Sequence, residues 1–195
     1  MEPQVRFCSS VDGARIGFAT AGSGAPLVFV GSTYGSLEES WSGRENLLDE
    51  LGRHRRVISY DHRGVGASLG DASDLSLAVE IGDLSTVVDH LGIERFDFWG
   101  VSESGAICAA YAAQNPDRVA RLILWNSCPS GPAIARPGAV EGVIGLIQSN
   151  WKLARAAISD MVFPTGPASA KQAAADSLER LGPDKSARRI EFFWS

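Results

Sequence analysis

The chain of 195 residues has few cysteines, and nothing suggests that they act together. Cys8, Cys108 and Cys128 are odd in number and far apart, so they offer neither the spacing of a metal site nor a disulfide framework. We therefore expect no metal, no cofactor and a reducing, cytoplasmic setting. Cys8 and Cys108 are expected to fill space in the core.

Excess positive charge and long apolar runs are also absent. The formal net charge is −5, which argues against a nucleic-acid-binding surface. No uninterrupted apolar run is long enough to span a bilayer, and the N-terminus lacks the basic start and apolar core of a signal peptide. Hydrophobic residues make up 45% of the chain, which favours a globular protein with a substantial core.

The most informative stretch of the sequence covers residues 96–106. Apolar and aromatic residues predict a strand that ends near residue 100, and a helix-forming run follows at residues 107–113. Between them, residues 100–104 read Gly-Val-Ser-Glu-Ser, a Gly-x-Ser-x-small turn. A strand, a sharp corner and a helix, in that order, are the context in which this motif marks a nucleophilic serine.

Ser102 is the expected nucleophile of this turn. Because Gly100 directly follows the strand, Ser102 falls at the apex, whereas Ser104 falls in the first helical turn and occupies the motif's last glycine position. The N-terminus of the following helix directs free N–H groups and positive dipole towards the corner, which suits an oxyanion. A Gly/Ser-rich connection that merely turns the chain is the alternative, and the surrounding order of elements argues against it.

Strands and helices alternate between residues 27 and 125. Residues 5–8 and 15–20 predict a hairpin before this region, with Asp-Gly at its turn. The further predicted strands are 27–30, 57–60, the strand before the corner and 119–125, and the predicted helices are 41–51, 77–91 and the helix from the corner to residue 115. This alternation predicts an α/β fold, with a mostly parallel sheet and helices on both faces.

The character of the sequence changes after Pro129. Residues 139–161 and 168–181 predict helices, and a segment rich in proline and glycine separates them. No further strand–loop–helix unit is predicted towards residue 195. We therefore divide the chain into an α/β core, residues 1–130, and a helical segment, residues 131–195.

The sequence resembles the α/β-hydrolase family. The matching pieces, which occur in the family's order, are residues 27–33, 61–68, 100–105 and 115–124. More narrowly, residues 36–41 and the second half of the chain resemble hydrolase domains found beside adenylate-cyclase or helix-turn-helix regulatory domains. The resemblance implies an α/β-hydrolase fold without its last two strands, with residues 131–195 as a lid over the pocket.

By this resemblance, the chain is a serine hydrolase acting on carboxylic esters or related acyl compounds, with Ser102 as its nucleophile. The backbone N–H of Glu103 is then one donor of the oxyanion hole. The second donor comes from the loop after residue 30, with Thr33 as the first choice and Ser32 as the second. A serine hydroxyl also needs a base, normally an imidazole oriented by a carboxylate.

The family's acid and histidine are missing from this chain. They follow the nucleophile in the family's order, but none of the three histidines, His54, His62 and His90, follows Ser102. His62 is the candidate substitute base, because it follows a strand on the ligand side of the sheet. We expect Asp61 and Arg63 to hold its loop. Activity is expected to be impaired, and the alternative function is a non-catalytic ligand-binding or regulatory domain.

Residues 119–125 are expected to form an exposed apolar edge of the sheet. Exposed edges of this kind pair with other chains. We therefore expect low solubility, a homodimer along this edge, or a completing polypeptide. A truncated gene or a gene fragment explains the short chain equally well. Apart from such a protein partner, we expect a small ester or acyl compound as ligand, and neither nucleic acid nor membrane.

Overall fold

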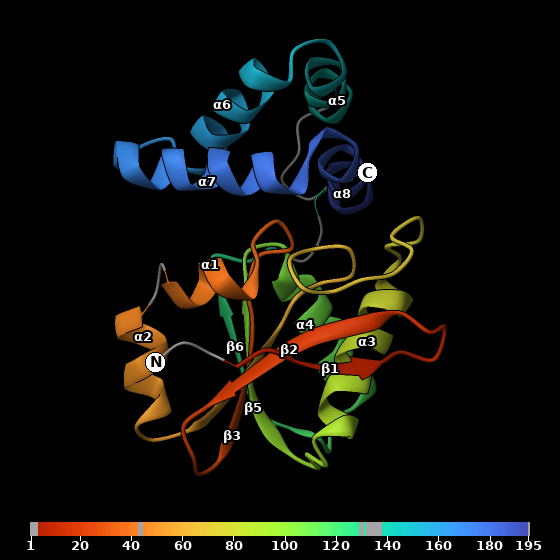
Figure 1. Cartoon of the computed structure of the whole chain (residues 1–195), viewed down its shortest axis with the longest axis vertical. Helices are drawn as coiled ribbons and strands as arrows, with labels where there is room; N and C mark the ends of the chain where they lie inside the picture. Colours follow the sequence, from red (N-terminus) through yellow and green to blue (C-terminus); the bar gives the residue numbers. More distant parts are fainter. Residues whose placement is uncertain (1–3, 43–44, 129–130, 132–137, 195) are drawn as a thin grey trace. The chain divides into compact units, whose positions relative to one another are not determined.

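The structure is a computed structural model that describes residues 4–42, 45–128, 131 and 138–194. The chain divides into two compact units, Met1–Pro129 and Ser130–Ser195 (Figure 1). The boundary expected from the sequence, between residues 130 and 131, lies beside this division. We refer to the first as the sheet unit and to the second as the helical unit.

The sheet unit contains a six-stranded sheet in the order β1-β2-β4-β3-β5-β6. β2 pairs antiparallel with both β1 and β4, whereas β4, β3, β5 and β6 run parallel to one another. The mostly parallel sheet predicted from the sequence is confirmed. The strands are Arg6–Ser9 (β1), Arg15–Ala21 (β2), Pro26–Val30 (β3), Arg56–Tyr60 (β4), Phe96–Val101 (β5) and Val119–Trp125 (β6).

Helices cover both faces of this sheet, as predicted (Figure 1). α1 (Leu37–Ser42) and α2 (Glu45–Gly52) lie on one side, and α3 (Leu77–His90) and α4 (Ser104–Gln114) lie on the other. The single helix predicted over residues 41–51 is therefore two elements, and α1 begins four residues earlier than predicted. The predicted helix from residue 77 is confirmed as α3.

Apolar side chains from both helical layers close on the strands. On the α1–α2 face, Trp41 and Leu48 belong to one buried cluster with Phe29 of β3. On the opposite face, the Tyr111 ring of α4 lies 5.6 Å from the Phe98 ring of β5. Cys108 is buried in α4, and burial raises the pKa of its thiol. This core holds the carboxyl ends of the parallel strands in fixed positions.

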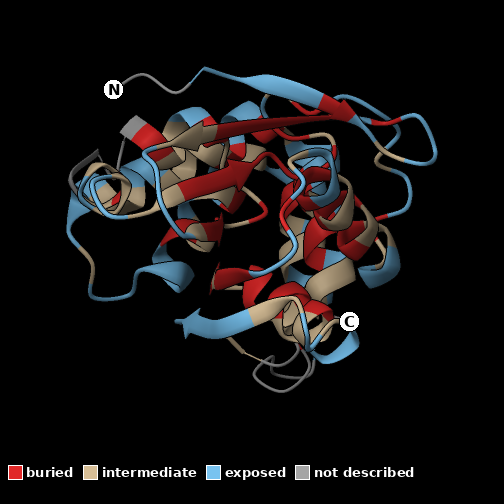
Figure 2. Cartoon of the chain, turned by 90° about the horizontal axis from the view of Figure 1, so that it is seen from below, coloured by how far each residue is buried: buried red, intermediate tan, exposed pale blue. Residues whose placement is uncertain are grey.

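The two edges of the sheet differ. β1 has four residues, among them Arg6 and Phe7, and the Arg15 guanidinium lies over the Phe7 ring. β6 has seven residues and lies beside β5 at the other edge of the sheet. The apolar side chains of β6 are 38% to 51% exposed, for the run Leu122, Ile123, Leu124 and Trp125. Figure 2 shows β6 almost wholly in the exposed colour. The predicted exposed apolar edge is confirmed.

The helical unit consists of helices and contains no strand in the part that the structure describes. Its helices are Ala139–Ser149 (α5), Trp151–Val162 (α6), Ala168–Leu181 (α7) and Pro183–Trp194 (α8). Residues 139–161 are helical as predicted, but they form two helices because the chain turns at Asn150. The Asn150 side chain accepts a hydrogen bond from the Leu153 N–H at 3.1 Å, which starts a new helix.

The last two helices of the helical unit differ in how far the sequence predicts them. The predicted helix 168–181 is confirmed by α7, which has the same bounds. The sequence did not lead us to expect α8, although Pro183 is well suited to a first helical position. Among the described helices of the whole chain, none has the length and apolar character needed to cross a membrane.

Candidate active site at the carboxyl ends of the parallel strands

Ser102 lies at the apex of a sharp corner between β5 and α4. Its φ angle is 57°, in the left-handed region that a residue with a side chain rarely adopts. Such a conformation costs about 1–3 kcal/mol and persists only where its surroundings impose it. Here the Ser102 N–H donates to the Trp125 carbonyl at 3.0 Å, which ties the corner to the end of β6. Ser104 is the first residue of α4, so the placement of both serines is as predicted.

Small residues around Ser102 make this corner possible. A Cβ atom added at Gly100 would lie 2.6 Å from the Cys108 sulfur, and one added at Gly105 would overlap the Ser127 hydroxyl. Ser104 is accommodated in a different way. Its hydroxyl is fully buried and donates to the Gly31 carbonyl at 2.5 Å. A serine therefore fits a position at which the motif usually has glycine, because its hydroxyl finds a partner.

Two groups at the corner are open to a ligand. Ser102 is partly exposed, and neither its hydroxyl nor the Glu103 N–H has a hydrogen-bond partner among the residues that the structure describes. A nucleophile and an adjacent N–H donor at a helix N-terminus are the two parts that an acyl-transfer site needs first.

The loop after β3 reaches the same corner, as predicted, but its donors are already engaged. The Glu103 carboxylate oxygen Oε1 accepts hydrogen bonds from the Thr33 N–H at 2.6 Å, the Thr33 hydroxyl at 2.9 Å and the Ser32 hydroxyl at 2.6 Å. The sequence predicts only a backbone role for Glu103. Its side chain is the feature that sequence reasoning missed, because no local pattern links residues 70 positions apart.

His62 contacts Ser104 and not the predicted nucleophile. The imidazole is buried, with Nδ1 2.7 Å from Glu80 Oε2 and Nε2 3.3 Å from the Ser104 hydroxyl oxygen. Nε2 also lies 3.4 Å from the Gly31 carbonyl oxygen. No hydrogen bond joins His62 to Ser102 in the described part of the chain. The substitute-base role thus lacks the contact that proton transfer requires.

Asp61 and Arg63 hold the loop after β4, as expected from the sequence. The Asp61 carboxylate accepts the N–H groups of Leu37 at 2.5 Å and Ala67 at 2.7 Å. Burial raises the pKa of Asp61 to about 6, against the opposing effect of those hydrogen bonds. Arg63 makes a two-pronged ion pair with Asp83 of α3, through Nε at 2.9 Å and Nη2 at 2.7 Å.

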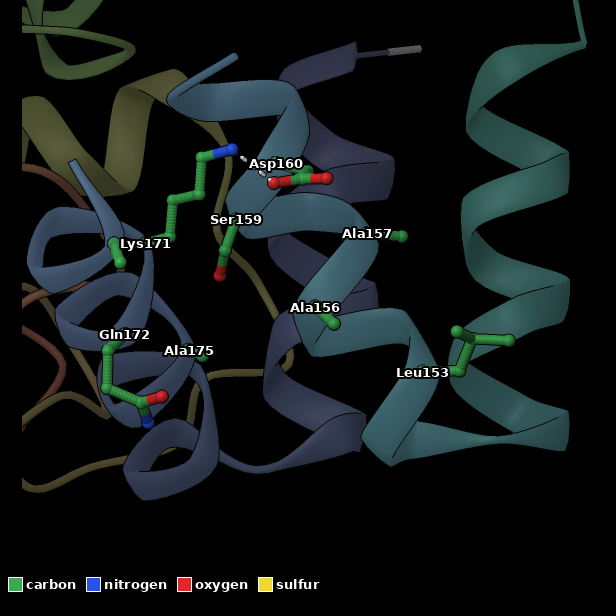
Figure 3. Close-up of a pocket in the computed structure, with 9 residues that line it drawn as sticks. Leu153, Ala156, Ala157, Ser159, Asp160, Lys171, Gln172 and Ala175 are labelled. Carbon is green, nitrogen blue, oxygen red and sulfur yellow. Dashed lines mark ion pairs between the residues drawn. The ribbon is translucent and has the colours of Figure 1, made fainter. Parts of the chain in front are cut away.

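The helical unit has a cavity of its own between α6 and α7, of about 490 Å³ (Figure 3). Alanine side chains form much of its lining, and Lys171 of α7 pairs with Asp160 of α6 at 2.6 Å. The buried Ser159 hydroxyl has no partner among the described residues. None of the predicted site residues lines this cavity. The described residues also contain no group of three His, Cys, Asp or Glu side chains that could hold a metal ion.

The fold agrees with a comparison against known families. The family model described as "alpha/beta hydrolase fold" matches residues 25–149, which is more than half of the chain. This chain belongs to the alpha/beta hydrolase fold family.

Curated relatives in this family include several hydrolases. The chain is 34% identical over 108 residues to a 2-hydroxy-6-oxo-2,4-heptadienoate hydrolase of Pseudomonas putida, a match that covers 54% of this chain and 38% of the relative. It is 29% identical over 119 residues to a soluble epoxide hydrolase of a Corynebacterium species, covering 61% and 40%. The chain thus spans about two fifths of the length of these relatives.

Solved structures share the fold over nearly all of this chain. An esterase from Exiguobacterium antarcticum has a TM-score of 0.81 and 20% identity, with 98% of this chain and 74% of that chain covered. The enol-lactonase from Burkholderia xenovorans has a TM-score of 0.76 and 22% identity, with 97% and 74% covered. At these identities the likeness shows the fold alone.

Proposed function

We propose that this chain supplies the nucleophile and the oxyanion donors of a serine hydrolase that acts on carboxylic esters or related acyl compounds. The observation that carries the proposal is the strained conformation of the partly exposed Ser102, beside a Glu103 N–H that has no partner among the described residues. Glycine would adopt a positive φ at this corner without strain, so the corner alone does not call for a serine. Strain of this kind is characteristic of functional positions.

In the proposed reaction, the Ser102 oxygen attacks the acyl carbon and its proton passes to a base. The carbonyl oxygen becomes an anion, which the Glu103 N–H and a donor of the loop after β3 stabilise, and the alcohol then leaves with a proton. Losing one such donor costs about 3–4 kcal/mol of barrier in acyl transfer. A serine at the apex favours this chemistry over epoxide opening, which calls for a carboxylate nucleophile at the same position.

The chain by itself is expected to be a weak catalyst. No histidine follows Ser102 in the sequence, and His62 contacts Ser104. Removing a triad member lowers the rate by several powers of ten, although the oxyanion hole and binding retain some catalysis. We propose that a completing polypeptide or a second copy pairs with the apolar β6 edge, and that the helical unit contributes a lid.

Acylation by an activated ester tests the proposed function. With p-nitrophenyl acetate, the chain is expected to release about one equivalent of p-nitrophenolate slowly as Ser102 is acetylated. The missing base slows both steps, but p-nitrophenolate is a good leaving group, so deacylation is slowed more. Ser102→Ala should abolish this release. Ser127→Ala is the matched control, since Ser127 is a neighbouring hydroxyl whose hydrogen bonds go to the main-chain carbonyls of residues 100 and 125.

A non-catalytic ligand-binding domain is the second candidate function. The Glu103 carboxylate on Thr33 favours it, because it occupies a donor that acyl transfer would use. The expected result for this candidate is that neither the folded wild type nor Ser102→Ala releases p-nitrophenolate from any of several activated esters. That result would refute the proposed hydrolase function.

A further inference from the structure

The loop after β3 has the construction of an anion site. Its donors are a main-chain N–H and a hydroxyl from Thr33 and a second hydroxyl from Ser32, and all converge on one oxygen. Thr33 is fully buried, so its two donors are not available to bulk water. Convergent, partly desolvated donors of this kind bind carboxylates and oxyanions strongly.

The occupant in this structure is the chain's own Glu103 carboxylate. We propose that Ser32 and Thr33 form a binding site for a carboxylate or an oxyanion, and that the Glu103 side chain fills this site until a ligand displaces it. Glu103 is thus a built-in competitor of the ligand. Its main chain offers one donor to the corner while its side chain withholds another.

Glu103 and a ligand compete because the Thr33 N–H can donate its single hydrogen to only one of them. The Thr33 N–H has one hydrogen, and it is committed to Glu103 Oε1 at 2.6 Å. A ligand oxygen can take that hydrogen only after the carboxylate leaves. An anionic ligand would also be repelled by the carboxylate at close range, so both effects favour exchange over joint binding.

The proposal about this site does not require that the chain is an enzyme. The part that concerns an oxyanion rests on the proposed function, but the binding of a carboxylate does not. A purely structural role is the alternative: Glu103 would then fasten the loop to α4 permanently, and its removal would leave a disordered loop with no affinity for anions.

Replacement of the Glu103 carboxylate by free acetate separates the two roles. The Glu103→Ala variant of the full chain is followed by NMR, with amide exchange and the chemical shift of the Thr33 N–H as readouts. Without acetate, we expect exchange of this amide to be about tenfold faster than in the wild type, since its acceptor is gone. Acetate, at constant ionic strength, should restore protection and shift the same resonance with a saturable, millimolar dependence.

Glu39→Ala is the matched control. Its carboxylate accepts the Ser36 N–H at 3.0 Å, close to the same loop, so the variant loses the same charge without removing the Thr33 partner. This variant and the wild type should respond at Thr33 only at acetate concentrations far above those that saturate Glu103→Ala, because the tethered carboxylate competes with acetate. A Glu103→Ala chain whose Thr33 amide ignores acetate, or whose acetate shifts fall elsewhere, would overturn the proposal.

Glu103→Gln covers the case in which the alanine variant does not fold. The amide keeps the shape of the side chain but is a weaker acceptor than the carboxylate. We expect the Thr33 amide to exchange several-fold faster in this variant, and unchanged exchange would refute the proposed competition. The p-nitrophenolate assay reports on Ser102 independently, so loss of one result does not imply loss of the other.

Discussion

The loops after β3, β4 and β5 differ sharply from the edge at β6. In the loops, buried polar groups are matched: Glu80 meets His62, and Asp61 accepts two main-chain N–H groups. On β6, apolar side chains such as Trp125, which is 51% exposed, have no layer over them in the described chain. We call the region of the loops after β3, β4 and β5 the finished side, because its buried polar groups are paired. We call the exposed β6 edge the open side.

This difference indicates which side supplies the nucleophile and oxyanion donors of the proposed reaction, and which side could receive the missing acid and base. Ser102 and its donors lie on the finished side, where packing imposes a strained conformation. Among the described residues, no histidine base with an orienting carboxylate is hydrogen-bonded to Ser102. The open side is the edge at which a further strand can join the sheet. Changes to the finished side should therefore cost stability, whereas changes to the open side should alter association.

The largest expected effect comes from Glu80→Ala. The substitution leaves the buried His62 Nδ1 without its partner and empties the space of a fully buried side chain, and the unsatisfied group and the cavity together cost about 3–5 kcal/mol in the free energy of unfolding. Urea unfolding measures it. Asp89→Ala is the control on the same helix, because its partner Arg118 is a surface residue and the pair is worth about 1 kcal/mol or less. Equal losses for both variants would contradict the comparison.

The next effect is a dependence of stability on pH through Asp61. Burial raises its pKa from 3.8 to about 6, so the folded chain holds this proton more tightly than the unfolded chain. Its contribution, about 3 kcal/mol, is fully present below pH 3.8 and is lost as the pH rises through about 6.

Urea unfolding at pH 4 and pH 7 checks this prediction. Asp61→Asn should remove that part of the fall in stability between about pH 4 and pH 7, since the amide does not ionise. Asp89→Asn, an exposed carboxylate, should leave the fall in place. An unchanged pH dependence in Asp61→Asn would show that Asp61 is not the group responsible.

A smaller effect is expected at the corner from Glu103→Gln. If the Thr33 N–H is the second oxyanion donor, its partial release should speed acylation of Ser102 by about tenfold, less than the full value of one donor. Stopped-flow release of p-nitrophenolate measures the rate, with Glu39→Gln as the control. Slower acylation in Glu103→Gln would mean that the carboxylate assists the loop instead of occupying it.

The smallest change in folding stability is expected on the open side. Ile123→Lys, at a side chain that is 43% exposed, should alter the free energy of unfolding by about 0.5 kcal/mol or less. The same change should weaken self-association along β6, because a charge on an edge strand opposes pairing. Sedimentation velocity measures this, and Val11→Lys, at a fully exposed hairpin turn, is the charge-matched control.

The sequence predicted the elements that local patterns define. The alternation of residues 27–125 led to the parallel sheet, and the glycine-flanked turn led to the apex position of Ser102. Both follow from period, propensity and sterics over a few neighbouring residues. The division expected near residue 130 rests on a local change as well, the end of the strand–helix alternation.

The site's polar network could not be predicted in the same way. The contact of His62 with Glu80, the place of the Glu103 side chain on Thr33 and the partner of Ser104 depend on which loops the fold brings together. The break at Asn150 was missed for another reason. Asparagine is a good helix N-cap, but the apolar pattern continues across it and favoured one long helix.

The most direct test of the central claim is to locate the adduct that a fluorophosphonate forms with the full chain. Peptide mass spectrometry identifies the modified residue. If Ser102 is a nucleophile lifted clear of the strands, the phosphonyl group will be found on Ser102, and Ser102→Ala will not react. A folded chain that forms no adduct, or forms it on another residue, would contradict the account.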